Sequence, residues 1–390
     1  MKEKLLKSIL PVVALVLLMK ATSCKKSADP INYSGSAMLS ESRGSLAAAS
    51  AGNKILFAGG AIYNVTYDVS NRVDIYDVSS GTWTTAQLSE ARNGLAGAAA
   101  GTKILFAGGY GNNGGVSSGS KTVDIYDVVS NTWTTAQLSE ARGSLAGAAA
   151  GNKILFAGGF SDINGVSKTV DIYDIPSNTW STAQLSEPRQ YLAAATAGNK
   201  TFFAGGDSDR DEVYNNVYPG VSKTVDIYDA LSNTWTTAQL SEARTSLAGA
   251  AAGNKVFFAG GLGGNGASKT VDIYDVPSNT WTTTQLSEGR AGVVAAAVGN
   301  VILFGGGYEP LFPPGGIGYI IDGGASNAVD ICNISSNTWT KSRLSEAREY
   351  PVAAGAGNKI LFAGGDIPPD SLHATYSASN TVDIFTLSGQ

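Results

Sequence analysis

Histidine and cysteine are almost absent from this sequence of 390 residues. There is one histidine, His373, and there are two cysteines, Cys24 and Cys332. Two cysteines cannot form a disulfide framework. A single histidine excludes most histidine-dependent catalysis and most metal sites built from imidazole ligands. We therefore expect neither a metal nor a cofactor.

Charge is also scarce, since charged residues make up 15% of the chain and the net charge is −5. There is no basic cluster beyond the N-terminus, so we expect no nucleic-acid partner. Glycine, alanine, serine and threonine are plentiful instead. Together with Val-Ile-Tyr-Trp runs and frequent turns, this composition favours an all-β protein.

The N-terminus carries the chain's export signal. Lys2, Lys4 and Lys7 precede Ser8–Met19, an apolar stretch of twelve residues that is too short to span a bilayer comfortably. Ala21-Thr-Ser-Cys24 follows it and resembles the cleavage box of a bacterial lipoprotein. An ordinary secretory signal and a short anchor are the alternatives.

The lipoprotein resemblance implies that Cys24 is the lipidated first residue of the mature chain. Residues 1–23 are then a signal peptide, and residues 24–31 are a short polar tether. The expected location is the cell envelope, with the lipid anchored in the outer membrane. The sequence does not decide between a periplasmic and an external orientation.

A unit of about fifty residues recurs through the rest of the chain. A Gly-Gly pair and a Val-Asp-Ile run each occur seven times, whereas tryptophan occurs six times. The last copy stops at Ile384-Phe385, before its tryptophan segment. The missing segment lies at the other end, where Asn32–Arg43 matches Asn131–Arg142 with Tyr33 in place of tryptophan.

Each unit predicts four strands, which we name a to d in chain order. In one copy, strand a covers Ser144–Ala150, strand b Lys153–Ala157, strand c Thr169–Tyr173 and strand d Trp180–Gln184. Tight turns such as Gly151-Asn152 separate them. Glycine and alanine crowd strand a, as expected where inner strands converge on an axis.

These residues carry a resemblance to the kelch repeat: a Gly-Gly doublet after an apolar strand, then a tyrosine about fifteen residues on and a tryptophan seven beyond it. The resemblance covers residues 32–390 and implies a seven-bladed β-propeller with four antiparallel strands per blade. The offset termini predict that the strand near 33–39 completes the blade made by residues 348–386. That pairing would remove the free sheet edges.

Strand alternation in such a propeller places the a–b and c–d turns on one face, the bottom, and the b–c and d–a connections on the other, the top. The turns of the bottom face are short and nearly uniform, whereas the b–c loops vary. The loops are Ala61–Asn71, Tyr110–Lys121, Phe160–Lys168, Asp207–Lys223, Leu262–Lys269, Tyr308–Asn327 and Asp366–Asn380. The top face is therefore the candidate binding face.

Every d–a connection contains an arginine with a glutamate two positions before it. In kelch propellers the matching arginines border the central pocket and can engage acidic partners, so these are candidate ligand-binding residues. An Arg–Glu collar that holds adjacent blades in register is the alternative. The arginines are Arg43, Arg92, Arg142, Arg189, Arg244, Arg290 and Arg348.

Aromatic side chains of the same face could form a platform for a sugar or a peptide. The candidates are Tyr191, Tyr308 and Tyr350, with Tyr214, Tyr218, Phe312 and Tyr319 from the loops. Packing of the long loops on themselves is the alternative. Asp207-Ser-Asp-Arg-Asp-Glu212 loosely suggests a calcium loop, but it lacks the glycine of an EF-hand, and a solvated acidic loop is the preferred interpretation.

These features predict a monomeric, non-enzymatic binding module that is held at a membrane through Cys24 and takes a protein, peptide or glycan on the top face. Two alternatives stay open. One is a metal-independent sugar-active enzyme of the sialic-acid mutarotase kind, because the single histidine excludes the kelch-type copper oxidases. The other is a structural or adhesive surface protein.

Overall fold

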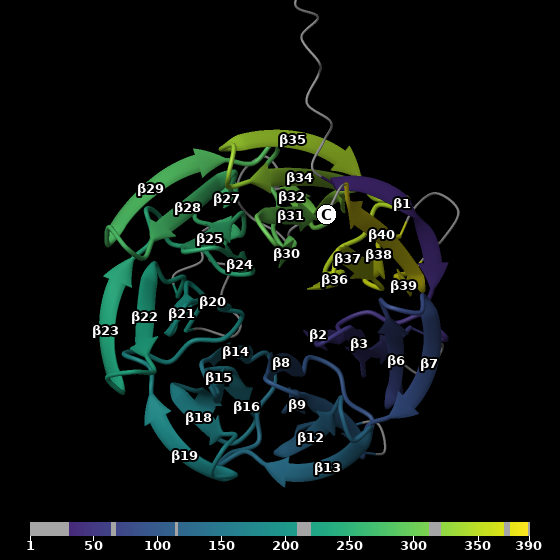
Figure 1. Ribbon diagram of the computed structural model, residues 1–390, viewed down its shortest axis with the longest axis vertical. Coiled ribbons are helices and arrows are strands. Elements are labelled where there is room, and N and C mark those ends of the chain that lie inside the picture. Colours follow the sequence, from purple (N-terminus) through teal and green to yellow (C-terminus); the bar gives the residue numbers. More distant parts are fainter. Residues whose placement is uncertain are drawn as a thin grey trace, which may run out of the picture.

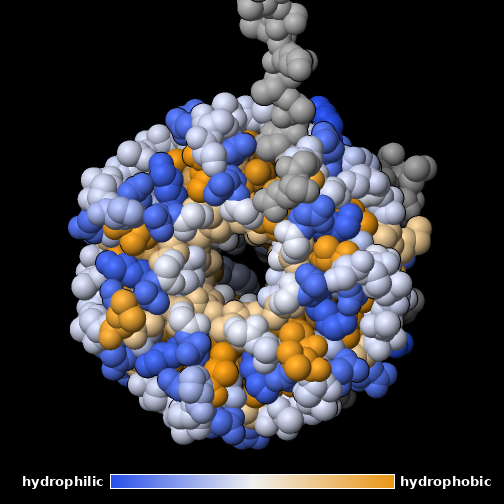
Figure 2. Space-filling view, viewed as in Figure 1, coloured by the Kyte–Doolittle hydropathy of each residue, from blue (hydrophilic) through white to orange (hydrophobic). Residues whose placement is uncertain are grey.

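A computed structural model describes residues 31–63, 68–113, 116–208, 220–311, 321–369 and 375–388. Within these ranges the regular elements are all strands, and they form seven four-stranded antiparallel sheets. The sheets are arranged in a ring around an open central channel (Figures 1 and 2). The seven-bladed all-β propeller is confirmed.

Each blade contains strands a to d from the channel outward. Blade 1 has β2 (Ala47–Ala51), β3 (Lys54–Ala58), β6 (Arg72–Asp77) and β7 (Thr82–Gln87); blade 2 has β8 (Ala96–Ala100), β9 (Lys103–Ala107), β12 (Thr122–Asp127) and β13 (Thr132–Gln137); blade 3 has β14 (Ala146–Ala150), β15 (Lys153–Ala157), β18 (Thr169–Asp174) and β19 (Thr179–Gln184); blade 4 has β20 (Ala193–Ala197), β21 (Lys200–Ala204), β22 (Thr224–Asp229) and β23 (Thr234–Gln239).

The remaining blades repeat this order. Blade 5 has β24 (Ala248–Ala252), β25 (Lys255–Ala259), β28 (Thr270–Asp275) and β29 (Thr280–Gln285); blade 6 has β30 (Val294–Val298), β31 (Val301–Gly305), β34 (Ala328–Asn333) and β35 (Thr338–Arg343); blade 7 has β36 (Val352–Ala356), β37 (Lys359–Ala363), β40 (Thr381–Leu387) and, as its outermost strand, β1 (Ile31–Met38).

The ring closes where the two ends of the chain meet. Strand β1 pairs antiparallel with β40 and supplies strand d of blade 7, as predicted (Figure 1). Tyr33 lies opposite Phe385, and their ring centroids are 5.5 Å apart. Tyr33 therefore occupies the place that tryptophan has in the other blades.

Small residues allow the seven inner strands to approach one another around the channel. Strand a of each blade contacts strand a of the next, and the contacts close into a ring. At Gly97 in β8, a Cβ atom would lie only 2.7 Å from the backbone oxygen of Ala48 in the neighbouring blade. The glycine and alanine content of strand a thus follows from the geometry at the axis.

Apolar clusters between neighbouring blades form the core. In one of them Leu56 of blade 1 packs with Phe106 and Tyr126 of blade 2, and Trp133 covers the edge. The Tyr126 and Trp133 rings are 4.9 Å apart. Cys332 takes the tyrosine's place in blade 6, where burial raises the pKa of its thiol to about 11. These motif residues fill space between blades.

The b–c loops are more regular than the sequence suggested, because six of them begin and end as a short two-stranded hairpin. These hairpins are β4 (Ala61–Ile62) with β5 (Asp68–Val69), β10 (Tyr110–Asn113) with β11 (Val116–Gly119), β16 (Phe160–Ser161) with β17 (Gly165–Val166), β26 (Leu262–Gly263) with β27 (Gly266–Ala267), β32 (Tyr308–Leu311) with β33 (Ile321–Ala325), and β38 (Asp366–Ile367) with β39 (Ser377–Ala378). They extend the top face above the blades.

Candidate binding face

The seven arginines of the d–a connections are completely buried. In one copy, Arg92 is 0% exposed, and one of its guanidinium nitrogens donates to the backbone oxygens of Gly108 (2.6 Å) and Thr122 (2.8 Å). Its other terminal nitrogen forms an ion pair with Asp124. All seven copies make the same pair, with Asp74, Asp124, Asp171, Asp226, Asp272, Asp330 and Asp383.

This arrangement differs from the Arg–Glu collar that the sequence suggested. The main partner is the aspartate of the Val-Asp-Ile run, whose other oxygen accepts the backbone N–H at the start of the same connection, as in Ser89 to Asp124 at 2.8 Å. The glutamate accepts from a serine hydroxyl, as in Ser120 to Glu90, and stays 3.5 Å from the arginine Nε. The aspartate on strand c is buried and needs a cation, whereas the glutamate reaches solvent.

The arginines thus lie beneath the surface and hold each d–a connection to the blade that follows it. Burial lowers the pKa of Arg92, and Asp124 and Glu90 oppose that effect. We correct the assignment of Arg43, Arg92, Arg142, Arg189, Arg244, Arg290 and Arg348 as ligand-binding residues, because each side chain is at most 1% exposed. A ligand on the top face cannot reach them.

The second residue after each arginine lies at the top mouth of the channel. All seven have a left-handed backbone, and five backbone hydrogen bonds link neighbouring copies from Ser45 round to Gly292. We call these residues the mouth ring: Ser45, Gly94, Ser144, Tyr191, Ser246, Gly292 and Tyr350. Glycine adopts this conformation readily, whereas for the three serines and the two tyrosines it is energetically costly because they have a Cβ atom.

Tyr350 interrupts the mouth ring. Among the described residues no backbone hydrogen bond links Tyr350 to Gly292 or to Ser45. The Tyr350 ring lies over Gly292 instead. A Cβ atom added to Gly292 would be only 2.8 Å from a carbon of that ring. The Tyr350 hydroxyl donates to that of Tyr308 at 2.8 Å, and the two ring centroids are 5.3 Å apart. The structure therefore brings two of the predicted aromatic residues together.

Two acidic residues lie beside this tyrosine pair. Glu349 and Asp366 are 4% and 7% exposed and form a backbone bridge at the base of the β38–β39 hairpin. Burial raises the pKa of Asp366 to about 6, against the opposing hydrogen bond from Tyr63. A Cβ atom added to Gly44 would lie only 1.6 Å from Asp366 Oδ1. The connection that leads into blade 1 must therefore have glycine at position 44.

Burial raises the pKa of Tyr350 well above its usual range, and the neighbouring Tyr308 is the second cause of this rise. Glu349 and Tyr191 contribute in the same direction. Tyr191 lies at the same opening because its backbone hydrogen bonds to Ser144 and Ser246 place it in the mouth ring. The Tyr191 side chain is 51% exposed. We name Tyr191, Tyr308, Glu349, Tyr350 and Asp366 the mouth cluster.

The sequence did not single out Asp366. A signal was present for Asp366, because the residue after the Gly-Gly pair is apolar or aromatic in five blades and acidic only in blades 4 and 7. In blade 4 this residue is Asp207, whose carboxylate accepts from Gln190 (3.0 Å) and Thr245 (2.8 Å). Protein donors thus bind both oxygens of Asp207.

Several predicted features lie outside the described residues: Cys24, residues 209–212 of the acidic loop, Tyr214, Tyr218, Phe312 and Tyr319. Within the described ranges no group of three or more histidine, cysteine, aspartate or glutamate side chains could hold a metal ion. The same ranges contain no helix with the length and apolar character needed to cross a membrane.

Comparison with known families decides the repeat type. A family model described as the KLHDC2/KLHL20/DRC7 Kelch-repeats domain matches residues 94–307, which is more than half of the chain. The chain belongs to the Kelch-repeat family. Its fold is also similar to the solved "Structure of YjhT", with a TM-score of 0.57 and 17% identity over 78% of this chain and 99% of that one. No curated protein matches.

Proposed function

We propose that this Kelch propeller is a non-enzymatic binding module whose ligand, a protein, peptide or glycan, lies over the channel mouth. The observation that supports it most strongly is the presence of tyrosine at positions 191 and 350 of the mouth ring. Their φ angles are 49° and 43°, and the other five copies are serine or glycine. Both tyrosine rings are exposed, at 51% and 36%, where the other copies have a small residue, and exposed tyrosine is typical of recognition surfaces.

The mouth cluster has the chemistry of a recognition site. The aromatic faces of Tyr191 and Tyr350 offer flat apolar area, and phenol hydroxyls add hydrogen bonding. Rigid blades beneath, held by the arginines, fix these side chains in place. Glu349 and Asp366 are only 4% and 7% exposed, so a ligand would contact the tyrosine rings and hydroxyls, and these two carboxylates lie behind that surface.

The test is the double variant Y191S/Y350S, which introduces the residue found at three other positions of the mouth ring. The full chain is screened on a glycan array and used as bait for peptides and proteins, with L231S as the control. Leu231 is 80% exposed in the c–d turn of blade 4, on the bottom face. We expect the ligand to be lost only with Y191S/Y350S. Retention by this variant would overturn the proposal.

A sugar-active enzyme of the mutarotase kind is the second candidate, and Asp366 favours it. A carboxyl group with a pKa of about 6 can give and take a proton near neutral pH. NMR exchange between the anomers of sialic acid, with wild type and D366N, tests this candidate. No acceleration by the wild-type protein would exclude it. A chain that neither binds nor accelerates exchange, but mediates cell attachment, would support the adhesive alternative.

We also propose that Cys24 carries a lipid that holds the propeller at the cell envelope. The proposal rests on Ala21-Thr-Ser-Cys24 after the apolar stretch. Labelling cells with an alkyne fatty acid should modify the wild-type chain, and the C24S variant should stay unlabelled. Equal labelling of both chains would contradict the anchor.

A further inference from the structure

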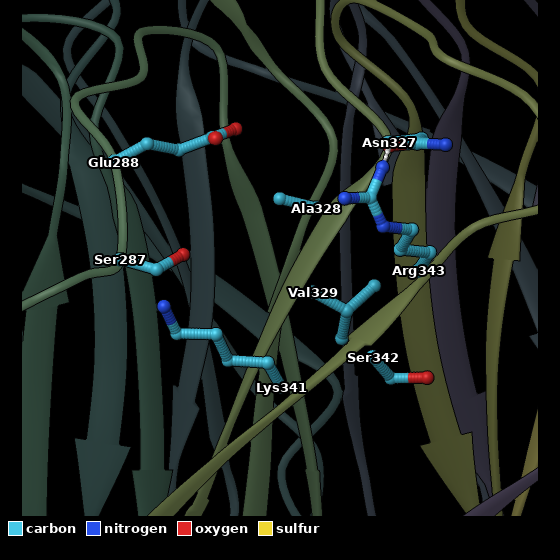
Figure 3. A pocket seen from close by; sticks show the side chains of 8 residues that line it. All are labelled: Ser287, Glu288, Asn327, Ala328, Val329, Lys341, Ser342 and Arg343. Carbon is cyan, nitrogen blue, oxygen red and sulfur yellow. Dashed lines mark hydrogen bonds between the residues drawn. The ribbon is translucent and has the colours of Figure 1, made fainter.

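A second cavity lies at the rim of the propeller, away from the channel mouth. It has a volume of about 330 Å³ and lies between the d–a connection of blade 5 and strands β34 and β35 of blade 6 (Figure 3). Polar side chains dominate its wall: Ser287, Glu288, Asn327, Lys341, Ser342 and Arg343. The volume is within the range of small-molecule sites.

Blade 6 differs from its siblings at this place. Lys341-Ser342-Arg343 occupies positions where blades 1 to 4 have Thr-Ala-Gln and blade 5 has Thr-Thr-Gln. Both cations are therefore additions to a neutral outer strand. The repeats supply an internal comparison, because the neighbouring blades have the same backbone without these two charges, and blade 5 has a single lysine, Lys269, in place of Asn327.

Neither cation forms an ion pair in the described part of the chain, and Asp330, which lies opposite Lys341, is paired with Arg290 instead. By contrast, Lys54 and Lys103 pair with aspartates of their own blades. Arg343 donates to the side-chain oxygen of Asn327 at 3.3 Å. Figure 3 shows the Lys341 ammonium directed toward Ser287 and the Arg343 guanidinium toward Asn327.

Glu288 contributes a negative charge on the opposite wall. Its carboxylate accepts from the Ser326 hydroxyl and lies 3.9 Å from the buried Arg290, so part of its charge is offset within the protein. The cavity therefore has the Lys341 ammonium and Glu288 on the side of Ser287, and the Arg343 guanidinium on the side of Asn327 (Figure 3). It has no aromatic wall on which a nucleobase could stack.

We propose that this cavity binds a carboxylate-bearing sugar residue. The Arg343 guanidinium would take the carboxylate, for which arginine has the matching planar geometry, and the Lys341 ammonium would donate to an oxygen of the sugar on the Ser287 side. Ser287 and Glu288 would bind the sugar hydroxyls. This site is separate from the mouth cluster, so its occupancy does not depend on the function proposed above.

The test measures binding of trigalacturonate to the full-length protein by calorimetry at low salt. The K341T/R343Q variant introduces the residues that most other blades have, so its fold should be retained. We expect it to lose affinity by about tenfold or more, because two charge-assisted contacts are removed. Neutral galactotriose should not bind, and Y191S/Y350S should bind trigalacturonate like the wild type.

The control is K168N/K223N, which also removes two positive charges. Both lysines are exposed and precede strand c in blades 3 and 4, where blades 1, 6 and 7 have asparagine. This control should keep the wild-type affinity. The proposal is wrong if both double variants weaken binding equally, if K341T/R343Q binds normally, or if inorganic sulfate competes as well as trigalacturonate does.

Discussion

Seven buried Arg–Asp pairs, one at each passage between blades, are the main electrostatic feature at the scale of single residues. Each pair joins a connection to strand c of the following blade, and in blade 4 Arg189 and Asp226 are 0% and 3% exposed. Breaking a buried ion pair leaves an uncompensated charge in the interior. The aspartate therefore contributes more to the stability of the folded protein than the exposed glutamate two residues before the arginine.

We predict that D226A lowers the free energy of unfolding by about 3–5 kcal/mol, because Arg189 stays buried without its partner. The matched variant E187A should lower it by about 1 kcal/mol or less, because that side chain is 41% exposed and 3.7 Å from Arg189. Urea unfolding of both variants measures the difference. Equal losses would restore the Arg–Glu collar as the main link.

Asp366 should make stability depend on pH in an unusual direction. Its pKa rises from 3.8 in the unfolded chain to about 6 in the folded protein. The folded state therefore keeps a proton that the unfolded state has lost, and this contribution to stability falls as pH rises from about 4 to 6. Above pH 6 the free energy of unfolding has lost at most about 3 kcal/mol through this group.

We predict that D366N is more stable than the wild type at pH 8, and that it lacks the fall between pH 4 and 6. Asparagine keeps an oxygen for the Tyr63 hydroxyl but carries no charge to bury. Thermal unfolding of the two proteins over pH 4–8 gives the comparison. If the melting temperature of the wild type depends on pH in the same way as that of D366N, Asp366 does not bury a charged carboxylate above pH 6.

At the scale of elements, β1 decides whether the ring is closed. It is the only strand of blade 7 that comes from the other end of the chain, and it buries Ile31 and covers the edge of β40. An uncovered β40 would expose its row of backbone groups. Blade 7 should then be the least stable blade.

We predict that removing residues 31–38 lowers the melting temperature by about 10 °C or more and promotes aggregation. A chain that begins at residue 31 serves as the control and should melt like the full chain. A synthetic peptide of residues 31–43 should restore part of the lost stability. Unchanged melting of the shortened chain would show that the seam is not needed.

Repetition determined how much of this molecule the sequence could predict. Seven copies of Gly-Gly and Val-Asp-Ile predicted the blades, and the displaced segment around Tyr33 predicted the seam, because each rests on a local pattern. The pairing of Arg92 with Asp124 was missed because it joins residues 32 positions apart. The contact between Tyr350 and Tyr308 and the burial of Asp366 were missed because they depend on how loops of adjacent blades meet.

For the whole molecule, the two faces differ in the way that a binding propeller requires. The bottom face has short turns that repeat from blade to blade, whereas the top face has hairpins of different lengths around the mouth cluster. The seven arginines support this top face from below and are not part of its surface. A ligand is therefore expected to contact the hairpins and the tyrosines.

Site-specific photocrosslinking from the two faces of one blade tests this account most directly. A benzophenone amino acid replaces Tyr191 on the top face or Leu231 on the bottom face of blade 4, and cells that express the full chain are irradiated. We predict that a crosslinked ligand forms from position 191 and not from position 231. Crosslinking from position 231 alone, or equally from both, would contradict a binding face at the channel mouth.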